Sequence, residues 1–123
     1  MYPISAPHSH KKTVRRTLAT SIARGDRLVT DAAVFQKILH GYCSMHRADA
    51  IRAVFDALHG VVDDVCAVKL AGVERAEALM LAVPSFSARR AIHVAIMQRR
   101  GVRRVISLDP GFDAFPWVKR IRR

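Results

Sequence analysis

The chain has 123 residues, of which half are apolar and a quarter charged, and it carries a formal net charge of +11. This length and composition predict one domain over residues 1–123 with a core of its own, and they exclude a disordered chain. No apolar run approaches the roughly 20 residues that cross a bilayer, and the N-terminal MYPISAPHSHKK lacks the apolar centre of a signal peptide. We therefore expect a cytoplasmic protein with no membrane contact.

Helices and short strands are expected to alternate after an irregular, Pro-containing segment over residues 1–8. Hydrophobic periodicity and stop signals predict helices over residues 9–24, 31–45, about 51–60, about 73–83 and 88–100, and strands over 27–30, within 61–68 and over 104–108. This order is typical of an α/β fold in which helices flank both faces of a short parallel sheet. Because such folds ordinarily begin with a strand, a first strand is missing from this order.

Several residues mark where these helices begin, end and pack. Asp31 and Ser87 are expected N-caps, and Gly101 is an expected C-terminal stop. The first helix is expected to bury the apolar face that contains Val14, Leu18 and Ile22. Two cysteines are too few for a disulfide scaffold, and each lies in an apolar stretch, so both are expected to be buried free thiols: Cys43 and Cys66.

The basic residues gather at both ends of the chain. Residues 1–24 hold five basic and no acidic residues. Residues 25–88 hold six basic and eight acidic residues, and residues 89–123 hold ten basic and two acidic residues. Clustered Lys and Arg release counterions when they bind phosphates, which favours a polyanionic partner such as RNA, DNA or an acidic protein tail. Arginines on solvent-facing helices also keep a protein soluble, so that alternative stays open.

Two carboxylates follow the last predicted strand. Asp109 comes directly after it and Asp113 follows four residues later, at the edge where open parallel sheets bind ligands. The alternative is that Asp-Pro-Gly is a simple turn with Asp as its first residue, and composition alone favours the turn.

The histidines and aromatic residues give weaker signals. His8 and His10 have the spacing of a small metal clip but no third ligand, so we do not assign them a site. His93 is expected to be half-buried against the sheet rather than a ligand. Phe115 and Trp117 could stack on nucleic-acid bases, although anchoring the C-terminal segment is the favoured role.

The segments LVTDAAVFQKILHGYCSMHR (28–47) and SARRAIHVAIMQRRGVRRVISLDPGFD (87–113), with the spacing between them, resemble PIN-domain proteins, particularly VapC-type toxins. The resemblance covers nearly the whole chain. It implies a PIN-like three-layer fold and a metal-dependent ribonuclease that holds Mg²⁺ or Mn²⁺ in a cluster of acids and is blocked by an antitoxin. Carboxylates that hold such cations generate hydroxide and stabilise charge on a phosphate, which suits RNA cleavage.

This sequence departs from the acidic pattern of that family at several positions. The first strand of the family, with an Asp in a V-D-T-N type motif, has no counterpart. Lys37 stands where the family usually has a Glu, and Arg90 stands at the third acidic position. Ser107 and Asp109 match the family's final S-x-D element, and Asp113 is a candidate supporting acid.

The resemblance therefore implies a defined set of site residues. Ser107 and Asp109 are the catalytic candidates, Asp109 and Asp113 the metal candidates, and Lys37 and Arg90 the substrate-binding candidates. Two cations at acidic positions disfavour Mg²⁺ or Mn²⁺ and favour a phosphate or an acidic side chain. We expect RNA cleavage to be impaired. The alternatives are a non-enzymatic module that binds RNA or an antitoxin, and a decayed toxin remnant.

The missing first strand bears on the partners. The resemblance places it in the middle of the sheet, where its absence leaves backbone groups unpaired, so a stable monomer is not expected. An upstream start, decay of the gene and a partner that supplies the missing surface are the competing explanations. The expected partners are RNA, an antitoxin protein and a second copy of the chain.

Overall fold

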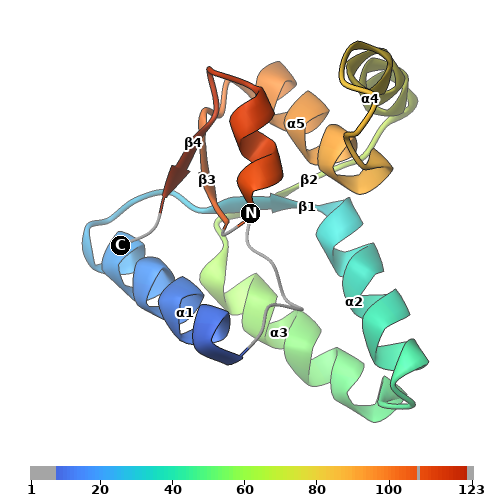
Figure 1. The fold of residues 1–123 in the computed structure, drawn as a ribbon. Coiled ribbons are helices and arrows are strands. Elements are labelled where there is room, and N and C mark those ends of the chain that lie inside the picture. Colours follow the sequence, from blue (N-terminus) through green and yellow to red (C-terminus); the bar gives the residue numbers. More distant parts are fainter. Residues whose placement is uncertain (1–7, 108, 122–123) are drawn as a thin grey trace.

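A computed structural model describes residues 8–107 and 109–121, with the backbone alone for residues 8–14. Figure 1 shows short strands with helices packed around them. In chain order the elements are α1 (His8–Ala23), β1 (Val29–Asp31), α2 (Ala32–Ser44), η1 (Ala48–Ala50), α3 (Ile51–Val61), β2 (Asp64–Cys66), α4 (Leu70–Ala82), α5 (Ala88–Arg100), β3 (Arg104–Ile106), η2 (Pro110–Ala114) and β4 (Lys119–Ile121). The α/β class is confirmed. Most of the irregular segment predicted over residues 1–8 lies outside the described residues, although its last residue, His8, begins α1. The last residue of the strand predicted over 104–108 also lies outside them.

The predicted helix boundaries are confirmed where a polar cap or a glycine marks them. The Asp31 side chain accepts a hydrogen bond from Val34 N at 3.2 Å and begins α2. Ser87 Oγ accepts one from Arg90 N at 3.2 Å and begins α5. Gly101 ends α5 with φ 68°, a left-handed conformation that glycine adopts without steric cost. These interactions span three or four residues, which is why the sequence predicts them.

The strands form two parallel pairs instead of one sheet. Strand β1 pairs with β2, with Thr30 opposite Val65, and β3 pairs with β4, with Val105 opposite Arg120. The prediction of three strands was wrong because it missed β4, whose sequence Lys-Arg-Ile is too short and polar to show a strand period. This strand forms through a distant partner: Lys119 N donates to Arg103 O at 2.7 Å.

The largest core cluster lies where α4 and α5 pack together against β3 and η2 (Figure 1). Phe115 is buried in it, and its ring centroid is 4.9 Å from that of Phe86. Trp117 is half-buried against the same cluster. The anchoring role predicted for Phe115 and Trp117 is thus confirmed. A smaller cluster joins α2 to α3 through Val34, Ile38 and Leu58.

Helix α1 presents a different face to the core from the one predicted. Thr17 and Ser21 are buried, whereas Ile22 is 53% exposed. The buried residues each come one position before Leu18 and Ile22 in the sequence. The buried face is therefore rotated by about 100° around the helix axis from the predicted face. Val14 was also expected to be buried, but its side chain lies outside the described ones. One cysteine also differs from the prediction: Cys66 is buried, but Cys43 is exposed.

Candidate functional site

Three predicted site residues come together from three elements. Lys37 lies one turn into α2, Arg90 lies in the first turn of α5, and Asp109 follows β3. Arg90 Nη2 lies 2.6 Å and Arg90 Nε 2.7 Å from Asp109 Oδ2. The two side chains are 25% and 33% exposed, so water screens this ion pair only in part.

Both carboxylate oxygens of Asp109 are engaged. Oδ2 accepts from the Arg90 guanidinium, and Oδ1 accepts from Gly111 N at 2.9 Å. The second contact makes Asp109 the cap of η2, so the Asp-Pro-Gly turn that the sequence offered as an alternative is present. Asp109 therefore stabilises the turn through Oδ1 and binds Arg90 through Oδ2.

Arg90 is confined on several sides. Its Cζ lies 5.3 Å from the centre of the Phe86 ring, which gives the guanidinium a cation–π contact. A Cβ atom placed on Gly111 would collide with this guanidinium, so the glycine leaves the space that Arg90 occupies. These contacts hold the arginine beside Asp109.

Lys37 adds a second positive charge on the α2 side. Burial lowers the pKa of its ammonium below the usual value, the nearby positive charge of Arg89 lowers it further, and Asp109 opposes both effects. Lys37 is therefore close enough to both Arg89 and Asp109 for its charge to interact with theirs. We call Lys37, Arg89 and Arg90 the cationic cluster: Arg90 contacts Asp109, and Lys37 interacts with both Asp109 and Arg89 through its charge.

Ser107 is buried and supports the backbone at this point. The Ser107 Oγ accepts a hydrogen bond from Asp109 N at 3.0 Å, and Ser107 is 4% exposed. This contact orients Asp109, while burial keeps the hydroxyl away from solvent.

Asp113, the other metal candidate, is held by a different arginine. Arg120 Nε and Nη2 lie 2.9 Å from Asp113 Oδ1 and Oδ2, a two-pronged contact. The hydrogen bond that Arg120 donates to Asp113 raises the pKa of Arg120. Residue Arg120 belongs to β4, so this pair ties η2 to the last strand.

The donor set at this site does not fit Mg²⁺ or Mn²⁺. Such cations require several oxygen ligands free to coordinate, yet Asp109 and Asp113 are each paired with an arginine. Among the described side chains, those of residues 15–107 and 109–121, no three from His, Cys, Asp or Glu gather in a way that could hold a metal ion. The metal clip considered for His8 and His10 concerns side chains outside the described ones.

One buried pair, His93 with Asp31, was missed by the sequence analysis. His93 Nδ1 is 2.6 Å from Asp31 Oδ2, and Asp31 is fully buried. His93 is more buried than expected, at 8% exposed. Because 62 residues separate the two in sequence, periodicity and spacing carry no signal for this contact. The pair joins the start of α2 to α5, the helices that carry Lys37 and Arg90.

No described helix combines the length and apolar character needed to span a bilayer.

Comparisons with known proteins give the family. Ribonuclease VapC13 of Mycobacterium tuberculosis and VapC ribonuclease Mb1869c of Mycobacterium bovis are each 42% identical to the chain over 121 residues, which is 98% of this chain and 92% of each relative. Ribonuclease VapC23 of Mycobacterium tuberculosis is 30% identical over 109 residues, 89% of this chain and 86% of the relative. No protein-family model and no solved structure matches the chain. Identity of this extent over nearly the full length shows common descent, and the chain belongs to the VapC family of PIN-domain proteins.

Proposed function

We propose that this protein binds RNA through its cationic cluster and that metal-dependent cleavage at that site is impaired. The observation that carries the proposal is the contact of Arg90 with Asp109 at 2.6 Å. In this pair the guanidinium of the protein neutralises the carboxylate that a bound metal ion would otherwise neutralise. The relatives VapC13 and VapC23 are named ribonucleases, which supports RNA as the ligand class.

The charge balance of the cluster favours an anion. Lys37, Arg89 and Arg90 bring three positive charges, and Asp109 brings one negative charge. Arg90 uses two nitrogens on Asp109, while a guanidinium has five N–H donors, so donors remain for a phosphate. Arg89 is exposed and reaches solvent directly. The phosphate backbone of a nucleic acid is a polyanion that such an arrangement recognises.

The same contacts weaken hydrolysis. Activation of water on a divalent cation needs carboxylates free to hold that cation, and Asp109 is engaged by Arg90 and Gly111. Asp113 is engaged by Arg120 of β4. We therefore assign Asp109 and Ser107 to positioning Arg90 and the turn, and Lys37 and Arg90 to the phosphate.

The family also suggests a binding partner and a place of action. The proposal includes an antitoxin protein as partner and a cytoplasmic location, where RNA is available. A second copy of the chain remains a prediction of the resemblance.

RNA binding and cleavage are tested together with a labelled single-stranded RNA, by fluorescence anisotropy and by gel analysis with Mg²⁺ or Mn²⁺. The Lys37→Glu/Arg90→Glu variant should weaken binding by on the order of tenfold and flatten the salt dependence. The control, Arg47→Glu/Lys69→Glu, makes the same charge change at exposed positions outside the cluster.

Two results would contradict the proposal. Cleavage by the unmodified protein that needs Mn²⁺ and disappears in Asp109→Ala would show a working metal site. Equal weakening of RNA binding in both charge-reversed variants would show that total charge, and not the cationic cluster, binds RNA.

A further inference from the structure

The buried Asp31–His93 pair does more than the cap of α2 requires. Asp31 Oδ1 accepts a hydrogen bond from Val34 N at 3.2 Å and begins α2. A Ser, Thr or Asn side chain could make that contact without a partner on another helix. The second oxygen of Asp31, Oδ2, lies 2.6 Å from His93 Nδ1. One carboxylate therefore joins the first turn of α2 to α5.

The pair lies close to the cationic cluster along both helices. His93 follows Arg90 by three residues and Arg89 by four in α5, so both arginines are its neighbours on the helix surface. Lys37 follows Asp31 by six residues, which is about 9 Å along the axis of α2. A change in how α2 meets α5 at this pair therefore changes the distance from Lys37 to the two arginines.

Like charges of the cationic cluster oppose the contact between α2 and α5. Burial lowers the pKa of the Lys37 ammonium, the positive charge of Arg89 lowers it further, and Asp109 raises it. Lys37 of α2 and Arg89 of α5 therefore repel each other. An attractive contact between the two helices is needed to offset this repulsion, and the Asp31–His93 pair supplies one.

Burial makes this pair a well-defined link between the helices. Asp31 is fully buried and the His93 side chain is 11% exposed, so water competes little for their hydrogen bond. Apolar side chains in contact can shift past one another, whereas a hydrogen bond of 2.6 Å fixes both a distance and a direction. The pair therefore favours a single arrangement of α2 against α5.

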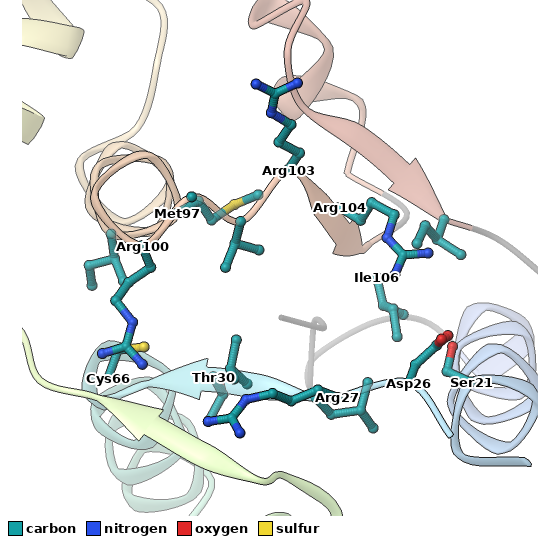
Figure 2. Close-up of a pocket in the computed structure, with 16 residues that line it drawn as sticks. Ser21, Asp26, Arg27, Thr30, Cys66, Met97, Arg100, Arg103, Arg104 and Ile106 are labelled. Atoms are coloured by element: carbon teal, nitrogen blue, oxygen red, sulfur yellow. The ribbon is translucent and has the colours of Figure 1, made fainter. Parts of the chain in front are cut away.

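An exposed contact at the other end of α5 offers a comparison. Arg100 Nη2 lies 2.8 Å from Asp64 Oδ2, and Figure 2 shows the Arg100 side chain extending from α5 toward Cys66 of β2. The two side chains of the ion pair are 47% and 39% exposed, so water screens their charges. Arg100 is ten residues from Arg90, about 15 Å along the helix, so this contact should have little effect on the cationic cluster.

We propose that the Asp31–His93 pair is a positioning clamp, which holds Lys37 at the distance from Arg90 at which one RNA phosphate contacts both side chains. Neither residue of the clamp touches the RNA. The inference rests on the proposed function, because it gives the pair a part in the RNA binding that we assign to the cationic cluster. It follows that the clamp acts on RNA affinity through Lys37 and not independently of it.

Variants of the full chain separate the hydrogen bond of the clamp from its side chains. His93→Leu removes the donor, whereas His93→Asn keeps a side-chain N–H close to the position of Nδ1. His93→Leu also leaves the Asp31 carboxylate buried and unpaired, which is destabilising. Asp31→Ser/His93→Leu avoids that cost, because the serine keeps a capping hydroxyl on α2 and brings no charge. Arg100→Gln removes the exposed contact of α5 and is the control.

RNA affinity is measured by fluorescence anisotropy with labelled single-stranded RNA, under conditions in which urea denaturation shows each variant to be folded. The two variants without the clamp, His93→Leu and Asp31→Ser/His93→Leu, should bind about three- to tenfold more weakly. His93→Asn should recover most of that loss, and Arg100→Gln should stay within about twofold of the unmodified protein. In a Lys37→Met background, loss of the clamp should change the affinity by less than about twofold, because the cation that it positions is already absent.

The pKa of Lys37 gives a second measurement that needs no RNA. NMR of the Lys37 Cε signal follows the titration of the ammonium, whose pKa depends on burial and on the charges of Arg89 and Asp109. Loss of the clamp should raise this pKa toward its ordinary value of 10.5, because Lys37 becomes more exposed and moves away from Arg89. His93→Asn and Arg100→Gln should leave the pKa of Lys37 unchanged.

Three outcomes would overturn the inference. An unchanged pKa of Lys37 in both variants without the clamp would show that the pair does not position this side chain. An equal loss of RNA affinity with and without Lys37 would show that the pair acts through stability alone. A loss in His93→Asn as large as that in His93→Leu would show that the hydrogen bond is not responsible.

Failure of the proposed function would look different. Lys37→Glu/Arg90→Glu would then leave RNA affinity unchanged, while loss of the clamp would still raise the pKa of Lys37. That combination would contradict RNA binding by the cationic cluster and confirm that the Asp31–His93 pair positions Lys37.

Discussion

Arg90 and Asp109 form an ion pair in which two guanidinium nitrogens converge on one carboxylate oxygen, at 2.6 and 2.7 Å. The pair joins the first turn of α5 to the residue that follows β3. Because a cation of the chain itself occupies the coordination space of Asp109, the chemistry of this edge depends on whether that contact persists. The first two predictions address it.

Replacement of Arg90 by Met should lower the free energy of unfolding by about 1–3 kcal/mol, because the partly buried Asp109 loses a charge-assisted partner. Urea denaturation measures this loss. Arg89→Met is the matched control: Arg89 is exposed, so its replacement should change stability by less than about 0.5 kcal/mol. Equal losses in the two variants would show that the Arg90–Asp109 contact adds no stability.

Gly111→Ala should displace the Arg90 guanidinium without removing either charged group, since the added Cβ would occupy its position. We expect a stability loss of about 1 kcal/mol. Combined with Arg90→Met, the glycine substitution should add little, because both changes remove the same contact. A double-mutant cycle by urea denaturation makes this measurement, and additive losses would argue that Gly111 acts independently of Arg90.

Asp31→Ala should be the most destabilising of these changes, with a loss of about 3–5 kcal/mol. It removes the cap of α2 and the partner of His93 in a fully buried position. Asp31→Asn keeps a side-chain oxygen for the cap and should lose less. Thermal and urea denaturation compare the two, and equal losses would mean that the cap contributes nothing.

Lys37→Met should stabilise the protein slightly at neutral pH, by less than about 1 kcal/mol. Burial disfavours the charged ammonium in the folded state, so its folded pKa lies below the 10.5 of the unfolded chain. Between these two pKa values the unfolded state binds more protons, and the contribution of Lys37 to stability therefore rises with pH. The advantage of Lys37→Met should shrink as pH rises through that window.

Urea denaturation of both proteins at several pH values below 10.5 follows that difference. An advantage that is independent of pH would assign the effect to packing of the Met side chain. RNA affinity should fall in Lys37→Met at neutral pH, where the ammonium is charged, since the phosphate loses a cation.

The local signals of the sequence were sufficient for the helices and for the turn after β3. Asp31, Ser87 and Gly101 mark helix ends through contacts a few residues long, and Asp109 begins its predicted turn. Family resemblance, and not periodicity, identified Lys37 and Arg90 as cations at acidic positions. Their convergence on Asp109 was consistent with that resemblance, because the elements that carry them meet at one edge of the fold.

The sequence by itself determined the order of helices and strands as far as β3, the caps and the excess of positive charge, because each depends on residue type or on neighbours along the chain. Only the tertiary structure decided which charges pair. The pairing of Asp31 with His93, and that of Asp113 with Arg120 of β4, depends on the meeting of separate segments. The division of the strands into two pairs likewise arises from backbone hydrogen bonds, which carry no side-chain signature.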